Sequence, residues 1–269
     1  MYYNREIVKI KSKRRKKLLT DAHLHLQSPL FDADVDTVVT ESRKAGIGAF
    51  WCAAETLDDC EKLAALHEKF PQIAVFAGTH PWYAEKHDFK RLERFLIDHP
   101  HAQIGETGLD ALKGNPYQEK AFEDHLTLGA ALHRAVVVHC VKAAQDVIRI
   151  LKKFPAPPPF LCHAFYGGRN EIAFLADKGG YFSLNARFFT RPDFAERLAF
   201  YPPDRVLIET DAPYMRPDAS LCVNPQESRN APQNLVLTFK RLAQLYGIDE
   251  RALADGLSRN AAAFLKAGQ

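Results

Sequence analysis

A short strand-like stretch near the N-terminus carries three residues that could bind a metal. Asp21, His23 and His25 are spaced two apart and follow the apolar pair Leu18 and Leu19. Residues two apart on a strand point to the same face, so this spacing predicts that the three side chains project together. Two neutral imidazoles and a carboxylate on one face suit a divalent metal ion. The competing interpretation is a partly buried strand with two incidental histidines.

The same kinds of residue end five further apolar runs. They are His80, then Glu106 and Asp110, then His139, then His163, and finally Glu209 and Asp211. A single strand that ends in histidine is more often a satisfied part of the core. Burying this many polar groups together is costly unless they bind a metal or hydrogen-bond partners. The whole pattern therefore predicts a metal site.

The ligand types divide between two ions. A two-metal site needs a bridging carboxylate, and Glu106 is the candidate because the glycines beside it let the backbone pack closely. Asp211 is also expected to accept a proton from the attacking water. We expect Zn²⁺ or Mn²⁺, with Mg²⁺ as the third candidate. The predicted ligands are His23, His25 and Asp211 for one ion, and His139 and His163 for the other.

Eight strand-like runs alternate with helical patterns along the chain. Several of the runs are continuously apolar, which is typical of parallel strands buried on both faces. This predicts the α/β class and a (β/α)8 TIM barrel, in which residues at the carboxyl ends of the strands gather at one rim. An open doubly wound sheet is the alternative, but no glycine-rich turn follows the first run. The expected strands are 18–25, 47–53, 73–78, 102–105, 135–139, 160–163, 181–184 and 206–209.

The chain has 269 residues and a net charge of only +3, but the charge is unevenly distributed. Residues 1–17 are expected to form a basic arm, and residues 18–269 a single hydrolase domain. Seven lysines and arginines lie between Lys9 and Lys17 with no acidic residue among them. Such a run is usually a solvated tail. The functional alternative is a contact with nucleic-acid phosphates.

Five scattered cysteines include no CxxC pair, and their odd number argues against a disulfide framework. A reducing cytoplasm is therefore the expected location. No run of eighteen apolar residues is present, so no membrane segment is expected.

Six motifs, in this order, resemble the TatD family of metal-dependent deoxyribonucleases, which belongs to the amidohydrolase-like barrels. They are DxHxHL at 21–26, GxHPW at 78–82, GExGLD at 105–110, HC at 139–140, CHxFxG at 162–167 and ETDxPY at 209–214. The resemblance implies a two-metal phosphodiesterase that uses the six ligands named above. It also suggests that His80 contacts the scissile phosphate.

The sequence departs from this family near the fifth strand and near residue 231. The family often has an arginine where this chain has Val141, and Lys142 is the nearest cation. The family's common Arg-Asn-Glu-Pro stretch has Ala231 in place of the glutamate. A lysine does not replace a planar bidentate phosphate contact, so the substrate stays open. DNA is the expected substrate and RNA the next. The alternatives are another ester or amide, such as a misacylated tRNA, and a non-enzymatic nucleic-acid-binding relic.

Overall fold

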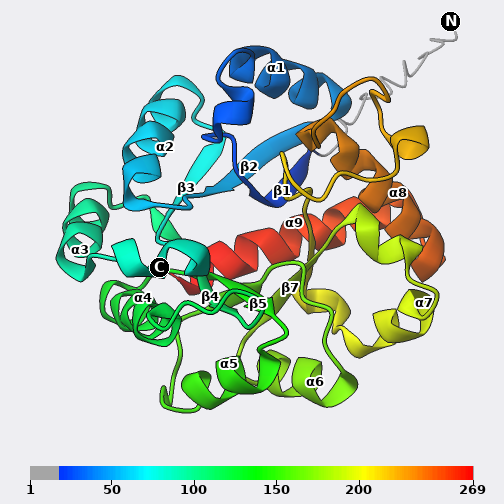
Figure 1. Cartoon of the computed structure of the whole chain (residues 1–269). Coiled ribbons are helices and arrows are strands. Elements are labelled where there is room, and N and C mark those ends of the chain that lie inside the picture. The colour runs from blue at the N-terminus through cyan, green and yellow to red at the C-terminus, as the bar shows by residue number, and fades with distance from the viewer. Residues whose placement is uncertain (1–17, 269) are drawn as a thin grey trace, which may run out of the picture.

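Eight parallel strands follow one another around the sheet in chain order (Figure 1). The computed structural model describes residues 18–268, so the predicted basic arm lies outside the described residues. The strands alternate with helices, which confirms the predicted (β/α)8 barrel. The strands are β1 (Leu19–Leu24), β2 (Ile47–Ala53), β3 (Ile73–Ala77), β4 (Gln103–Asp110), β5 (Val136–Val141), β6 (Phe160–Cys162), β7 (Tyr181–Leu184) and β8 (Val206–Ile208).

Helices surround the barrel, and one long helix crosses one of its ends (Figure 1). A glycine in the left-handed conformation, Gly46 at φ 106°, ends the first helix. No helix within residues 18–268 is long and apolar enough to cross a bilayer. The α-helices are α1 (Val35–Ala45), α2 (Leu57–Lys69), α3 (Phe89–Asp98), α4 (Gln118–Leu132), α5 (Ala144–Leu151), α6 (Arg169–Asp177), α7 (Phe194–Arg197), α8 (Leu235–Tyr246) and α9 (Glu250–Ala267).

Strand β4 is longer than the sequence indicates. It was expected to end at Gly105, but it pairs with β5 as far as Asp110 and Val141. The register shifts between Ile104 and Thr107, which places Glu106 at an irregularity inside the strand. Such irregularities re-aim side chains next to active sites. A Cβ on Gly105 would lie 2.0 Å from the carbonyl oxygen of Phe76, so only glycine lets β3 approach this closely.

The interior of the barrel is apolar below the polar rim, and α9 seals it. Phe264 on α9 is fully buried and packs against Trp51 at 5.4 Å and Tyr181 at 5.2 Å between ring centroids. Ala22 and Val137 belong to the same buried cluster. This apolar floor keeps water out of the barrel from below and leaves the carboxyl ends of the strands as the open side.

Two backbone hydrogen bonds close the barrel between the first and last strands. The Asp211 amide donates to the His23 carbonyl at 3.0 Å, and the His25 amide donates to the Ala212 carbonyl at 2.7 Å. The closure therefore fixes three of the predicted metal ligands relative to one another.

Candidate metal centre

All six predicted metal ligands lie together at one rim, in a single buried cluster. His23 and His25 come from β1 and the residue after it, and Asp211 comes from the loop after β8. Oδ1 of Asp211 lies 3.6 Å from Nε2 of His23 and 3.3 Å from Nε2 of His25. Asp211 has a φ of 57°, a left-handed conformation that non-glycine residues adopt most often at functional sites.

Contrary to the prediction, the side chain of Asp21 does not project together with those of His23 and His25. The register of β1 shifts between Asp21 and Leu24, so simple alternation fails there. Ala22 faces the barrel interior, and the carboxylate of Asp21 accepts hydrogen bonds from the amide and hydroxyl of Thr210 at 2.9 and 2.6 Å. Burial raises the pKa of Asp21 well above its usual range, and the Thr210 bonds oppose this shift. Asp21 therefore holds the residue before Asp211.

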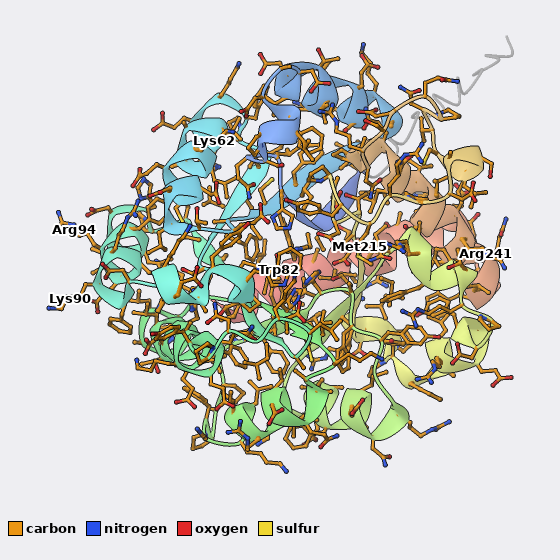
Figure 2. The ribbon with its side chains drawn as sticks, in the orientation of Figure 1. Lys62, Trp82, Lys90, Arg94, Met215 and Arg241 are labelled. Atoms are coloured by element: carbon orange, nitrogen blue, oxygen red, sulfur yellow. The ribbon has the colours of Figure 1, made fainter. Side chains whose placement is uncertain are left out.

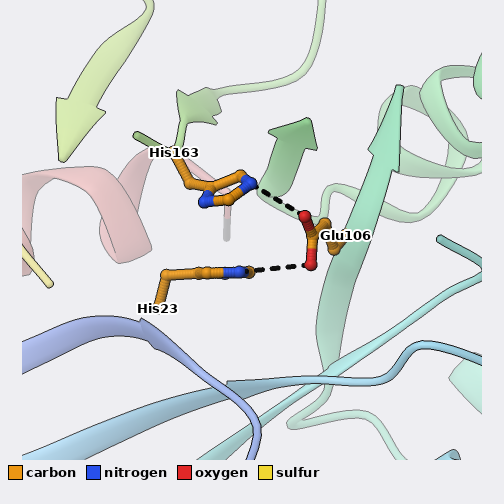
Figure 3. A group of neighbouring side chains, drawn as sticks. All are labelled: His23, Glu106 and His163. Atoms are coloured by element: carbon orange, nitrogen blue, oxygen red, sulfur yellow. Dashed lines mark ion pairs between the residues drawn. The ribbon is translucent and has the colours of Figure 1, made fainter. Parts of the chain in front are cut away.

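Glu106 stands between two sets of histidines, and each of its oxygens faces one set. Oε2 lies 3.2 Å from Nε2 of His23 and 3.3 Å from Nε2 of His25. Oε1 lies 2.7 Å from Nδ1 of His139 and 2.7 Å from Nε2 of His163. Figure 3 shows the carboxylate reaching toward His23 and His163 from the opposite wall of the barrel. This is the arrangement of a carboxylate that can bridge two ions.

The charge state of Glu106 follows from its neighbours. Burial opposes ionisation, but His163, His80 and His23 outweigh it and hold the pKa of Glu106 well below its usual range. Burial likewise disfavours the charged form of His25, yet Asp211 and Glu106 raise the pKa of His25 well above its usual range. The cluster is therefore a buried group of carboxylates and imidazoles in which neighbouring charges set the pKa of each side chain.

Residues around the cluster orient the ligands. Nδ1 of His25 donates to the carbonyl of Ala53 at 2.8 Å, which leaves Nε2 free for a metal. Nε2 of His139 lies 3.5 Å from Oδ2 of Asp110, and the same oxygen accepts from the indole of Trp82 at 2.7 Å. Nδ1 of His163 lies 3.8 Å from Glu209.

Glu209 is itself held by two polar side chains on the neighbouring strand and the loop after it. It accepts hydrogen bonds from the hydroxyl of Ser183 and, at 3.1 Å, from the amide of Asn185. Sequence reasoning missed Ser183, Asn185 and Gln27, whose amide donates to Ala53 at 2.6 Å. Polar residues of this kind are common and carry no spacing signal, and only the fold brings them to the ligands.

An unpaired nitrogen of the cluster fits a metal ion. Both ring nitrogens of His23 are buried without a hydrogen-bond partner, and Nε2 faces Oε2 of Glu106 and Oδ1 of Asp211. Leaving such a nitrogen unpaired is expensive, and coordination of a metal would satisfy it. Three sets of potential ligand atoms lie within 4.8 Å of one another: His23, Glu106 and His163; His23, His25 and Asp211; and His80, Glu106 and His139.

Of the two residues predicted to contact the substrate, His80 is buried and Lys142 is exposed. His80 is buried in the cluster, with Nε2 3.3 Å from Oε1 of Glu106, and its Nδ1 accepts from the Trp82 amide at 3.1 Å. Lys142 directly follows β5 and is exposed, and no residue within 18–268 forms an ion pair with it. Val141 is half-buried at the end of β5. Cys162 is buried in the barrel wall, and Cys140 is partly buried against the same apolar cluster.

A sequence profile of the TatD related DNase family matches residues 20–266, almost the whole chain. The chain belongs to this family. The predicted family resemblance is therefore confirmed, and with it the assignment to a family of hydrolases. The match begins at the residue before Asp21 and ends inside α9, so it includes every candidate ligand.

Relatives of known name and structure agree with this assignment. The chain is 30% identical over 246 residues to a 3'-5' ssDNA/RNA exonuclease TatD from Citrobacter koseri, and the match covers 87% of this chain and 94% of the relative. A TatD homologue from Escherichia coli K12 has a similar fold, with a TM-score of 0.83 at 22% identity over 92% of this chain and 98% of its own. A TatD family hydrolase from Entamoeba histolytica gives a TM-score of 0.80 at 16% identity over 93% and 98% of the two chains.

Proposed function

We propose that this protein is a metal-dependent nuclease that removes nucleotides from the 3′ end of single-stranded DNA or RNA. The observation that carries the proposal is the placement of Glu106: Oε2 faces His23 and His25, and Oε1 faces His139 and His163. The substrate and the direction come from the names of the relatives, which are 3'-5' ssDNA/RNA exonucleases.

His23, His25 and Asp211 would hold one ion, His139 and His163 the other, and Glu106 would bridge them. Divalent ions at these positions supply Lewis-acid activation of a water and neutralise charge on the phosphate. The mixed imidazole and carboxylate ligands suit Zn²⁺ or Mn²⁺, and Mg²⁺ is the third candidate.

Asp211 is proposed to accept the proton of the attacking water. Burial disfavours its charged form, but His25 and His23 outweigh this and lower the pKa of Asp211, which keeps the carboxylate ionised. An ionised carboxylate beside the proposed metal ligands can take a proton as the water attacks. The loop after β8 holds it there through the backbone bond to His23.

His80 is proposed to donate a hydrogen bond to the scissile phosphate. Its Nδ1 accepts from the Trp82 amide, so the ring proton is on Nε2, which points into the cluster. A protonated Nε2 has no lone pair for a metal and is a donor for a phosphoryl oxygen. This favours a phosphate contact over a third ligand set. Lys142, exposed just after β5, is proposed as a further phosphate contact outside the buried cluster.

The test uses metal-reconstituted protein and four substrates: single-stranded DNA, single-stranded RNA, duplex DNA and a chromogenic ester. We expect 5′-labelled single strands to shorten stepwise, and EDTA to stop the reaction. Hydrolysis of the ester alone would assign the site to another ester. Bound metal without any hydrolysis would contradict an enzymatic role.

A further inference from the structure

One acidic side chain at the rim has no part in the proposed metal site. Glu55 lies between β2 and α2 and is half-buried. Its carbonyl accepts from the His80 amide at 2.9 Å, and its amide donates to the carboxylate of Asp59 at 3.2 Å. These bonds fix the backbone of Glu55 against the loop that carries the proposed phosphate contact.

Tyr214 links Glu55 to the cluster. The Tyr214 hydroxyl lies 3.2 Å from both carboxylate oxygens of Glu55. The Tyr214 ring stands edge-on to the ring of His25, with 5.5 Å between their centroids. The carboxylate of Glu55 is therefore one phenol ring away from a proposed metal ligand. Tyr214 is 41% exposed, so the pair opens to the rim.

The carboxylate of Glu55 has unused capacity to accept hydrogen bonds. Two carboxylate oxygens offer about four acceptor positions, and the Tyr214 hydroxyl supplies one proton shared between them. No lysine or arginine within residues 18–268 forms an ion pair with Glu55. A half-buried carboxylate that has no ion-pair partner favours neutral hydrogen-bond donors such as hydroxyls and repels phosphates.

Positive charge lies elsewhere on the rim. Nζ of Lys113, just beyond β4, is 4.6 Å from the ring centroid of Trp82, whose indole is anchored to Asp110. Figure 2 shows Trp82 near the middle of the barrel view. In barrel order, Glu55 follows β2 and Lys113 follows β4, so one acidic and one basic side chain come on either side of the loop after β3 that carries His80.

We propose that Glu55, held by Tyr214, binds the 3′-terminal hydroxyl of the strand and excludes a phosphate from that position. This inference rests on the proposed nuclease function and gives a reason why only strand ends would be cut. A terminal nucleotide carries its 3′-hydroxyl one sugar ring from the scissile phosphate, and Glu55 lies one phenol ring from His25. A strand that continued past the site would place its next phosphate against the carboxylate. Glu55 is thus a specificity-determining residue.

The experiment compares three forms of one single-stranded oligonucleotide: one with a 3′-hydroxyl, one with a 3′-phosphate, and one closed into a circle. The proteins are the wild type, Glu55→Gln, Tyr214→Phe, and Glu61→Gln as a charge-matched control on the exposed surface of α2. Glutamine keeps an acceptor for the hydroxyl but removes the charge. Metal content is measured on each preparation so that damage to the cluster is detected directly.

We expect the wild type and Glu61→Gln to prefer the 3′-hydroxyl end over the 3′-phosphate end by roughly 10- to 100-fold, which lies between the effect of like-charge repulsion in water and near a protein surface. Glu55→Gln should reduce this preference at least about fivefold, mainly through faster cutting of the 3′-phosphate end, and should begin to cut the circle. Tyr214→Phe should weaken the preference less, because the ring remains.

Two results would overturn the inference. The first is an unchanged preference in Glu55→Gln with normal metal content, which would leave the nuclease proposal intact. The second is a wild type that cuts both ends equally well. A wild type that cuts no nucleic acid would instead refute the proposed function, and this inference with it.

Discussion

Replacing His125 with phenylalanine should destabilise the protein at neutral pH and much less in mild acid. His125 is fully buried on α4. Its Nδ1 donates to the Ala121 carbonyl at 2.6 Å, and its Nε2 accepts from the Thr79 amide at 3.0 Å. Burial, with a smaller contribution from His87, lowers the pKa of His125 to about 3. The native ring is therefore neutral, and it holds the residue before His80.

The sign of the pH effect follows from linkage. The unfolded chain has a histidine pKa of about 6.5, so between that value and about 3 the unfolded state binds more protons at this site. The stability from His125 is present above pH 6.5 and is lost as the pH falls. At pH 5 the loss is about 2 kcal/mol, from about 1.5 pH units at 1.36 kcal/mol each. Phenylalanine avoids this loss, but it leaves the Thr79 amide without a partner, at a cost of about 1–3 kcal/mol.

Urea unfolding followed by circular dichroism, at pH 7.5 and pH 5.0 in EDTA, measures both terms. The destabilisation by His125→Phe at pH 7.5 should shrink by about 2 kcal/mol at pH 5.0. Leu126→Ala is the matched control, because Leu126 is the buried neighbour and does not titrate. It should cost about 2–5 kcal/mol at both pH values. An equal effect of His125→Phe at both pH values would refute the buried, neutral state of His125.

Substitutions at three further positions test the residues around the cluster. Asp110→Ala should slow cleavage about 10- to 100-fold, because Asp110 orients His139. Asp110→Asn should recover part of this rate. Equal rates in the two variants would argue against an orienting role for Asp110. Asp211→Asn should lower kcat about 10²–10⁴-fold. By mass spectrometry it should keep more metal than Glu106→Ala. Near-normal cleavage by Asp211→Asn would show that Asp211 is not the base. Val141→Arg should raise the rate of cleavage of single-stranded DNA about tenfold by adding a charge-assisted phosphate contact. An unchanged rate with normal metal content would indicate that Lys142 already makes that contact.

Much of the fold can be predicted from the sequence, because buried parallel strands are unusually easy to recognise. The runs at 47–53 and 181–184 coincide with β2 and β7. The continuous apolar runs indicate strands buried on both faces, and eight strand-like runs alternating with helices specify a closed barrel. The boundaries of β4 were wrong, since Gly105 and Gly108 indicate a turn by type but lie inside the strand. Glycine is needed there for close approach of the neighbouring strand.

The residues that gather in the cluster could be predicted from the sequence, but their geometry could not. The proposed ligands stand at strand ends, and the barrel rule brings those ends together. The rule of alternating faces failed at Asp21, because a register shift in β1 is not visible in the residue types. Glu55 and Tyr214 meet across 159 positions in sequence, and no local pattern connects them. Contacts of this kind depend on how the loops fold over the rim.

The most direct test of the proposed two-metal arrangement is the number of ions bound per chain in the wild type and in Glu106→Ala. Both proteins would be stripped with chelator, reconstituted with Zn²⁺ or Mn²⁺, desalted and analysed by mass spectrometry. A carboxylate that faces both sets of histidines predicts two ions in the wild type and no more than one in Glu106→Ala, with cleavage lost. Two tightly bound ions in Glu106→Ala would contradict the bridging role of Glu106.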